Sequence, residues 1–297
     1  MQLNPLLWSM MITSVTSMTS ICGTHSPTRE QIQFARNLQL HEMDVRSLGS
    51  SLANETGINI DIYYHVIADA KSEQNGFVAP SALTHQTKVL NDAYRPHNIS
   101  WRQAGVDWSI APDWTSNQAE LAMKKFLRKG TYADLNIYIF PSIDYYHSAA
   151  FPKWVIVMGI VDAFPSAVMP QSEAWFQDAV LLRSDVLPGG TSSFNQGNTL
   201  YSADPPTSVY HTFEGGCRGD GDGIDDTPAE SDRVASSGIR GCDHGRDSCI
   251  GPGFDPVTNY MDYSEETCYN EFTHGQEVRM YSQWVQFRAP HRSYEAL

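Results

Sequence analysis

The regular spacing of apolar residues stops near Phe213, and this change limits what the chain can fold into. Before Phe213, short apolar runs alternate with stretches of helical periodicity, which predicts a layered arrangement of strands and helices. After it, residues 215–253 are rich in Gly, Asp, Pro and Cys and have little periodicity. Such a segment predicts irregular structure that needs cross-links for its stability. The sequence therefore predicts one layered subdomain followed by an irregular one.

The layered part predicts an α/β sheet of mixed direction, covered by helices on one side. His65, in the first predicted strand, is interpreted as a half-buried strand residue rather than a ligand. The predicted strands are 57–66, 99–106, 135–140, 154–161 and 179–182. The predicted helices are 79–94, 117–129 and, at the C-terminal end, 273–288, with a shorter amphipathic stretch at 32–40.

Four of the five cysteines lie in the irregular part, and Cys22 lies near the start of the chain. No Cys-x-x-Cys pair occurs among them, so the spacing of a zinc finger is absent. Two disulfides that hold together a loop-rich subdomain are the better interpretation. Four cysteines allow three pairings, and their spacing does not choose among these. The four cysteines are Cys217, Cys242, Cys249 and Cys268.

The N-terminal part of the chain predicts a secreted, extracellular protein. Residues 1–22 have the apolar content of a secretory signal but lack its basic start, so a poorly defined N-terminus is the alternative. Residues 23–56 are polar and are interpreted as a leader or pro-segment that lies on the surface. The acceptor tripeptides for N-glycosylation at Asn54 and Asn98 agree with secretion, although such tripeptides also arise by chance. No apolar run reaches the length of about 18–20 residues that a membrane span requires.

The charge of the chain is strongly negative, with 34 acidic against 20 basic residues and a net charge of −14. This balance argues against nucleic acid or an anionic membrane as a partner. Separately, we expect the protein to be a monomer. Residues 219–227 contain four Asp and three Gly, which is typical of a flexible oxygen-ligand site for calcium. The segment does not follow the EF-hand spacing, and a solvated acidic turn is the alternative.

Several short motifs, in this order along the chain, resemble those of the pappalysin-like metzincin metalloproteases. Between residues 210 and 285 they are YHTFEGGC, GDGIDDTPAE, GRDSC, DPVTNYMDYS, NEFTHGQ and RMYSQW. Upstream, DAVLLRSDVLPGG, YYHVI and CGT also match, so the resemblance extends over about residues 22–290. It implies a metzincin-like α/β (α+β) fold with an active-site helix, a Met-turn and a C-terminal helix. It also implies a catalytic domain over 57–290, divided into subdomains 57–211 and 212–290.

In that family one helix carries His-Glu-x-x-His-x-x-Gly-x-x-His. Its three histidines hold zinc, and its Glu takes a proton from the zinc-bound water. The resemblance implies that His211 is the third histidine, Met261 the Met-turn residue and Tyr263 a group that stabilises the tetrahedral intermediate. It implies a protein or peptide substrate.

The resemblance also implies features around this centre. The disulfides would be Cys217–Cys249 and Cys242–Cys268, and Cys22 would be a latency thiol, with a leftover cysteine of the signal region as the alternative. The candidate calcium ligands are Asp222, Asp225, Asp226 and Thr227.

The residues that the zinc helix needs are missing from the register set by His211. Tyr201 occupies the place of the first histidine, and Ser202 that of the catalytic Glu. Pro205 replaces the second histidine, and Ser208 replaces the glycine. His-Glu-x-x-His occurs nowhere else in the chain. His211 is therefore the only zinc ligand of the motif that remains.

The replacement changes the helix as well as its ligands. Adjacent prolines inside a helix remove two amide donors and clash with the preceding turn, at about 3 kcal/mol each. They are tolerated in a first turn, so Asp204 could cap a short helix over 205–213 that presents His211 alone. Tyr201 and Asp204 are the conceivable substitute zinc ligands.

Three hypotheses follow from this conflict between the motifs and the register. The first is a secreted zinc endopeptidase whose motif is interrupted over 201–209 by a frame slip or a misplaced splice junction, because both flanks are intact. The second is an inactive pseudoprotease that binds a peptide as an added strand. The third is an extracellular domain stabilised by calcium and disulfides, without a protease-like ligand. As its sequence stands, the chain is expected to be inactive.

Overall fold

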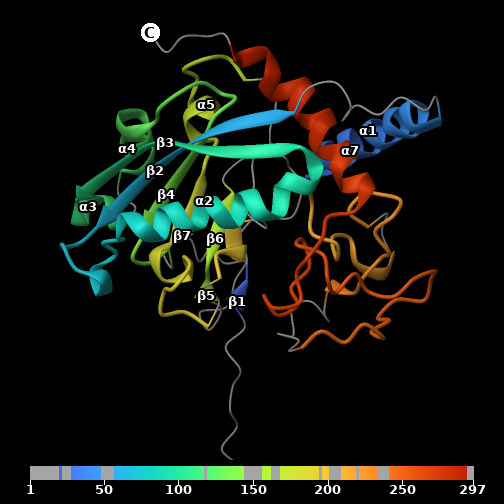
Figure 1. Ribbon diagram of the computed structural model, residues 1–297. Coiled ribbons are helices and arrows are strands. Elements are labelled where there is room, and N and C mark those ends of the chain that lie inside the picture. The colour runs from blue at the N-terminus through green and yellow to red at the C-terminus, as the bar shows by residue number, and fades with distance from the viewer. Residues whose placement is uncertain are drawn as a thin grey trace, which may run out of the picture.

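A five-stranded sheet lies at the centre of the first two thirds of the chain (Figure 1). The structure is a computed structural model that describes residues 20–21, 28–47, 57–116, 119–143, 156–161, 168–193, 196–200, 209–218, 221–232 and 241–292. The strand order is β3-β2-β4-β7-β6. Strands β2, β3, β4 and β7 are parallel, and β6 runs antiparallel to β7 at one edge. Their bounds are β2 Ile58–Ala68, β3 Ile99–Ile110, β4 Leu135–Phe140, β6 Gly159–Val161 and β7 Val180–Arg183.

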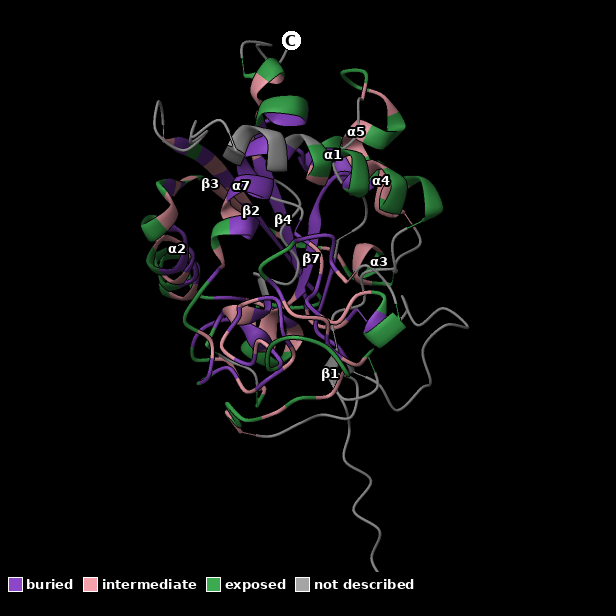
Figure 2. Ribbon diagram, turned by 90° about the vertical axis from the view of Figure 1, so that its right-hand side faces the viewer, coloured by how far each residue is buried: buried purple, intermediate pink, exposed green. Residues whose placement is uncertain are grey.

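Helices cover both faces of the sheet, and not one face as the sequence predicts. Strand β4 has apolar side chains on both faces, so each face needs cover. Ile137 packs in the same core as Leu83 and Leu90 of α2, which spans Pro80–Tyr94. Tyr138, which points the other way, packs with Met123 of α4, which spans Glu120–Leu127. Strands β2, β4 and β7 are accordingly buried over most of their length, whereas the edge strand β3 is largely half-buried or exposed (Figure 2).

The predicted elements are otherwise present, with shifted ends. The strand predicted at 154–161 is divided by Met158 into β5, Ile156–Val157, and β6. Strand β5 pairs in parallel with β1, Ser20–Ile21, in a separate two-stranded sheet. Two short helices, α3 at Pro112–Thr115 and α5 at Glu173–Gln177, complete this part. His65 is fully buried rather than half-buried, because both of its ring nitrogens have partners, Asp107 at 2.9 Å and Asn136 at 2.9 Å.

The C-terminal helix and the helix of the predicted leader pack against each other (Figure 1). Helix α7, His274–Gln283, starts with a capping box between Thr273 and Gln276 and continues as a π-helical turn at Trp284–Arg288. Helix α1, Arg29–Ser47, buries Ala35, Leu38 and Glu42. The prediction that this segment lies on the surface is therefore wrong for one face of α1, because that face supplies a buried ion pair to α7.

The part after Phe213 is irregular, as predicted, in its described ranges 214–218, 221–232 and 241–272. Two disulfides hold it together, Cys217–Cys249 and Cys242–Cys268. This is the pairing that the family resemblance implies. Among the described residues, no helix has both the length and the apolar character needed to span a bilayer.

Candidate metal centre

His211 lies in a buried position beside two aromatic rings. Its ring stacks on Phe213, with centroids 4.9 Å apart, and meets the edge of Tyr263 at 5.0 Å. The helix predicted over 205–213 is wrong in its described part, because Val209–His211 have no regular structure and turns follow. The amide of Thr212 donates to the carbonyl of Met261, 3.3 Å away, which ties this segment to the turn at Met261.

The imidazole of His211 has the state that a zinc ligand needs. Burial lowers the pKa of His211 to about 4, so the ring is neutral near neutral pH. Its Nε2 atom is buried and has no hydrogen-bond partner among the described residues. A buried polar atom without a partner costs free energy, and a metal ion would satisfy it. His211 therefore fits the role of one zinc ligand.

The rest of the zinc site is not supplied by the described residues, which contain no group of three His, Cys, Asp or Glu side chains placed to hold a metal. Tyr201, Ser202, Asp204, Pro205 and Ser208 lie outside the described residues. The residues that the structure brings together around His211 are Tyr263 and Met261. Tyr263 lies against the ring of His211, and the carbonyl of Met261 accepts from the next residue, Thr212.

Met261 is buried in a turn that three hydrogen bonds fix. The Asn259 side-chain oxygen accepts from the amide of Met261 at 3.0 Å. The side-chain amides of Asn259 and Gln276 are paired reciprocally at 2.8 and 2.9 Å, which ties the turn to α7. Met261 is 3% exposed and belongs to the same apolar core as the sheet. The burial of Met261 is therefore part of the packing of the fold.

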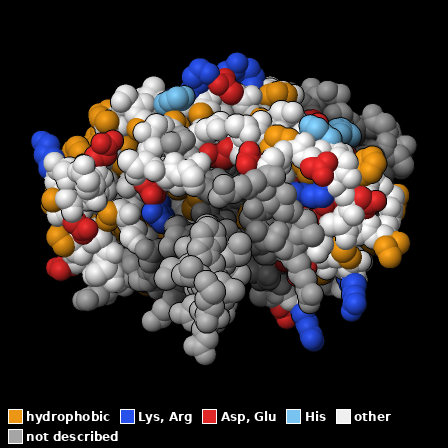
Figure 3. Space-filling model, turned by 90° about the horizontal axis from the view of Figure 1, so that it is seen from below, with side chains coloured by type: hydrophobic (Ala, Val, Ile, Leu, Met, Phe, Trp, Pro, Cys, Tyr) orange, Lys and Arg blue, Asp and Glu red, His pale blue; other side chains and the backbone are white. Residues whose placement is uncertain are grey.

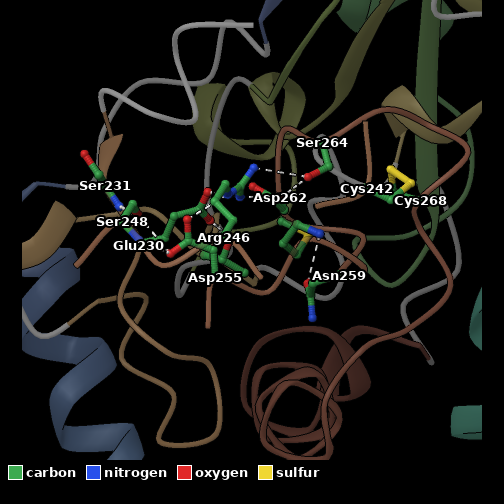
Figure 4. A network of polar contacts seen from close by, with 12 residues as sticks. Glu230, Ser231, Cys242, Arg246, Ser248, Asp255, Asn259, Asp262, Ser264 and Cys268 are labelled. Atoms are coloured by element: carbon green, nitrogen blue, oxygen red, sulfur yellow. Dashed lines mark hydrogen bonds and ion pairs between the residues drawn. A yellow bond between two sulfur atoms is a disulfide. The ribbon is translucent and has the colours of Figure 1, made fainter. Parts of the chain in front are cut away.

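A buried network of charges supports this turn from the other side (Figure 4). The guanidinium of Arg246 donates to Glu230, to Asp255 at 2.7 Å and to Asp262 at 3.1 Å. Glu230 also accepts from the Thr212 hydroxyl at 3.1 Å. Because Thr212 follows His211 and Asp262 follows Met261, Arg246 and Glu230 link the two halves of the candidate centre. Both residues lie in motifs of the resemblance, Glu230 in TPAE and Arg246 in GRDSC, but no local pattern predicts that they meet.

The network has three carboxylates for one guanidinium. Burial raises the pKa of Glu230 well above its ordinary value, and the neighbouring negative charge of Asp262 raises it further. Since Arg246 compensates only one of the negative charges, we infer that Glu230 holds a proton near neutral pH. Protonated Glu230 can both accept from Thr212 and donate to a second carboxylate.

The predicted calcium ligands are only partly brought together. Oδ1 of Asp222 accepts from the Thr227 hydroxyl at 2.6 Å, and its buried Oδ2 has no partner in the part of the chain that the structure describes. Burial raises the pKa of Asp222 to about 7. Asp226 instead caps α7 by accepting from Thr273 and Gly275, and Asp225 accepts from Gln39. Asp222 and Thr227 therefore remain the better pair.

Cys22 lies outside the described residues, but the two residues before it belong to β1. Strand β1 pairs with β5, which directly precedes the edge strand β6.

The surface seen from below mixes acidic and basic side chains, with no continuous basic patch among the residues drawn in colour (Figure 3).

Known proteins resemble this chain over most of its length. A family model described as peptidase M43, pregnancy-associated plasma protein-A, matches residues 207–284. An extracellular metalloprotease of Colletotrichum graminicola is 42% identical over 297 residues, which is 98% of this chain and 100% of that one. An extracellular metalloprotease of Neurospora crassa is 42% identical over 271 residues, 90% of this chain and 89% of that one.

The fold is similar to that of mirolysin from Tannerella forsythia. A mutant of its proform superposes with a TM-score of 0.58 and 20% identity, over 86% of this chain and 88% of that one. Mature mirolysin in complex with a cleaved peptide gives a TM-score of 0.54 at 19% identity, over 76% of this chain and 91% of that one. With these relatives, the chain belongs to the extracellular metalloproteases of the pappalysin-like metzincin family.

Proposed function

We propose that this chain, with the sequence it has, is a secreted member of the family that binds peptides without hydrolysing them. Its relatives are named as metalloproteases, and zinc is the usual metal of such sites. The observation that supports inactivity is the register back from His211. Tyr201, Ser202 and Pro205 stand where two zinc histidines and the catalytic Glu are needed.

Each missing group has its own consequence. Zinc in a protease is held by three protein ligands and keeps one position open for water. His211 supplies a single neutral imidazole, which alone holds the ion weakly. A general base must also accept a proton from that water, and the Ser202 hydroxyl is too weak a base to replace a carboxylate. We therefore expect little bound zinc and no cleavage.

The test is expression of the full chain, with measurement of bound zinc and of the hydrolysis of casein. A restored variant combines Tyr201→His, Ser202→Glu, Pro205→His and Ser208→Gly, with Pro206→Ala to remove the remaining helix breaker. We expect substoichiometric zinc and no hydrolysis by the unaltered chain, and a gain of both in the restored variant. Stoichiometric zinc with chelator-sensitive cleavage by the unaltered chain would overturn the proposal.

The alternative is an active zinc endopeptidase whose motif is interrupted in this sequence by a frame slip or a misplaced splice junction. Two observations favour it. The chain is 42% identical to a relative named as an extracellular metalloprotease, and the motifs on both sides of 201–209 are intact. The coding DNA for residues 194–211, read in all three frames, decides the matter. A frame or splice variant that encodes His-Glu-x-x-His supports the endopeptidase, and its absence leaves the inactive form.

The peptide site that we propose is the free edge of β6. The amide of Arg183 donates to the Met158 carbonyl. In this antiparallel pair the backbone N–H and C=O groups of Met158 and Ile160 therefore point toward β7. Gly159 and Val161 therefore turn their backbone groups to the other side, where no described strand pairs with them. An extended peptide can add there as a further strand. Mature mirolysin, which has a similar fold, has been captured with a cleaved peptide.

Peptide binding can be tested separately from catalysis. Fluorescence anisotropy with a labelled casein digest should detect binding by the unaltered chain. Val161→Pro removes an outward amide without removing a ladder bond to β7, so it should lower the affinity at an unchanged melting temperature. Casein peptides with N-methylated backbones should also bind less tightly. Equal binding of methylated and unmethylated peptides would rule out strand addition.

We also propose that the chain binds calcium, with Asp222 as a ligand and Thr227 beside it. The buried Oδ2 of Asp222, unpartnered within the described ranges, supports this, because a cation would compensate its cost of burial. Calcium should raise the melting temperature of the chain relative to excess chelator, and Asp222→Asn should abolish that rise. Asp225→Asn, at an exposed position, is the matched control. An identical calcium effect in Asp222→Asn would exclude this ligand.

We also propose that residues 1–22 are removed as a signal segment, that 23–56 form a leader, and that 57–290 form the protease-like domain. Removal of 1–22 and a latency role of Cys22 exclude each other, because the first eliminates the thiol. The N-terminal sequence of the secreted protein distinguishes them. A secreted chain that begins before Cys22 supports latency, and one that begins after it supports the signal segment.

A further inference from the structure

Asn98 occupies an exposed turn between α2 and β3. A short 3₁₀ helix, Arg95–His97, ends at Asn98, whose φ of 56° and ψ of 31° are left-handed. Asparagine adopts this conformation more readily than other residues with a Cβ. Its side chain is exposed and forms no hydrogen bond with any described residue, while the next residue, Ile99, is buried at the start of β3.

The backbone of this turn is held from two sides. The Asn98 carbonyl accepts from the amide of Ile58 at 3.0 Å and from the hydroxyl of Tyr281 at 3.3 Å. The turn therefore lies beside α7, as the views of the fold also show (Figure 1). On its other side, a Cβ on Gly57 would come within 2.8 Å of the Asn98 side-chain oxygen. Gly57 thus leaves room for the Asn98 side chain, which is exposed.

We propose that Asn98 carries an N-linked oligosaccharide. The tripeptide Asn98-Ile99-Ser100 has the hydroxyl residue that the acceptor pattern requires. An extracellular protein passes through the compartment in which this modification is made. A bulky, polar glycan is tolerated only where the asparagine side chain extends into solvent. The exposure of Asn98, its unused amide and its position in a turn fulfil that condition, which many chance tripeptides in strands or cores do not.

The chemistry is a transfer of a sugar chain to the amide nitrogen. Nδ2 of Asn98 attacks the anomeric carbon of a lipid-diphosphate-linked oligosaccharide, and a carbon–nitrogen bond forms. The bond between that carbon and the diphosphate oxygen breaks, so the lipid diphosphate leaves and the amide loses one proton. No oxidant or reductant is involved, and the chain itself contributes no catalytic group.

The experiment uses the full chain, secreted from a yeast host behind an added secretory signal. Trypsin releases residues 89–102 as one peptide, because Pro96 protects the bond after Arg95. An amidase that removes N-glycans, used in heavy-oxygen water, converts a modified Asn98 into labelled aspartate. We expect the labelled form of this peptide in mass spectra. Recovery of peptide 89–102 only as unlabelled asparagine would overturn the proposal.

Two variants at one position make a matched pair. Ser100→Ala destroys the acceptor tripeptide and keeps Asn98, so the modification should be lost. Ser100→Thr keeps a hydroxyl, so the modification should remain. Because the glycan is added before folding, the same peptide can be analysed from the microsomal fraction if a variant is not secreted. A label at Asn98 in Ser100→Ala would contradict N-glycosylation, as would its loss in Ser100→Thr. Asn54→Gln, at the second acceptor tripeptide, should leave the label at Asn98 unchanged.

Discussion

Arg279 of α7 forms a two-point ion pair with Glu42 of α1, from Nε to Oε1 at 2.8 Å and from Nη2 to Oε2 at 3.1 Å. The two side chains are 1% and 4% exposed, and 237 residues separate them in the sequence. Nη2 of Arg279 also donates to the carbonyl of Gly223 at 2.8 Å. The N-terminal helix, the C-terminal helix and the acidic turn therefore share one buried cation.

Removal of the carboxylate should release α1. Glu42→Ala leaves Arg279 charged and buried without its counter-ion, which typically costs about 3–5 kcal/mol. We expect the free energy of unfolding to fall by this order, and limited proteolysis within 29–47 to become faster. Glu30→Ala, on the exposed first turn of the same helix, should leave both measurements nearly unchanged. Equal protection of α1 in the two variants would show that the ion pair does not hold it.

The ion pair between Glu42 and Arg279 could not be predicted from the sequence. The polar composition of 23–56 predicts a surface leader, and its apolar spacing predicts only the part of helix α1 at 32–40. Nothing near Glu42 in the sequence indicates that its partner is Arg279, because an ion pair across the fold has no local periodicity. The strands were predicted well, since alternation or continuity of apolar residues is a local property. Helices on the second face of the sheet were missed, although the apolar residues on both faces of β4 required them.

Arg246 should be more important for stability than any exposed arginine. Arg246→Met removes the only cation next to Glu230, Asp255 and Asp262 in the described network and leaves buried carboxylates behind. We expect a loss of about 3–5 kcal/mol in the free energy of unfolding, measured by urea denaturation. Arg102→Met breaks a pair with Asp61 in which the arginine is 77% exposed, so water already screens the pair and its loss should change the free energy of unfolding far less. Similar losses in the two variants would contradict the role given to the network.

The candidate centre was predicted from motifs and not from physics alone. His211, Met261 and Tyr263 were named because their neighbours match a family pattern, and the structure brings these three together. The connection through Thr212, Glu230 and Arg246 could not be predicted, because each bond joins residues that lie 16 or 18 positions apart in irregular sequence. In such sequence neither helical nor strand periodicity indicates which side chains meet.

Glu230 should make stability depend on pH. Its pKa is raised in the folded state from an ordinary value near 4.5, mainly by burial, so the folded chain binds this proton more tightly than the unfolded chain. Between the two pKa values the folded state holds more protons, and the free energy of unfolding falls as pH rises. The contribution of Glu230 to the free energy of unfolding is complete below its pKa in the unfolded state. It is lost as the pH rises toward its pKa in the folded state.

The measurement is the free energy of unfolding from about pH 5 to pH 8. Over this range the raised pKa of Glu230 should make that free energy fall as the pH rises. Glu230→Gln cannot titrate, so its stability should fall less steeply over this range than that of the unaltered chain. Glu173→Gln, at an exposed position, should keep the original slope. A slope in Glu230→Gln identical to that of the unaltered chain would show that Glu230 does not hold the proton.

Met261 tests whether packing at the candidate centre depends on a metal. Its side chain lies in the apolar core that also contains Val209, Phe272 and Met280, so its burial is a packing property of the fold. Met261→Asp places a carboxyl group there without a partner, and we expect a loss of more than about 4 kcal/mol or failure to fold. Met261→Leu conserves volume and should cost less than about 1.5 kcal/mol. Because packing and not coordination sets these values, thermal unfolding with zinc and with chelator should give the same difference between the two variants. A difference that appears only with zinc would mean that Met261 acts through the metal.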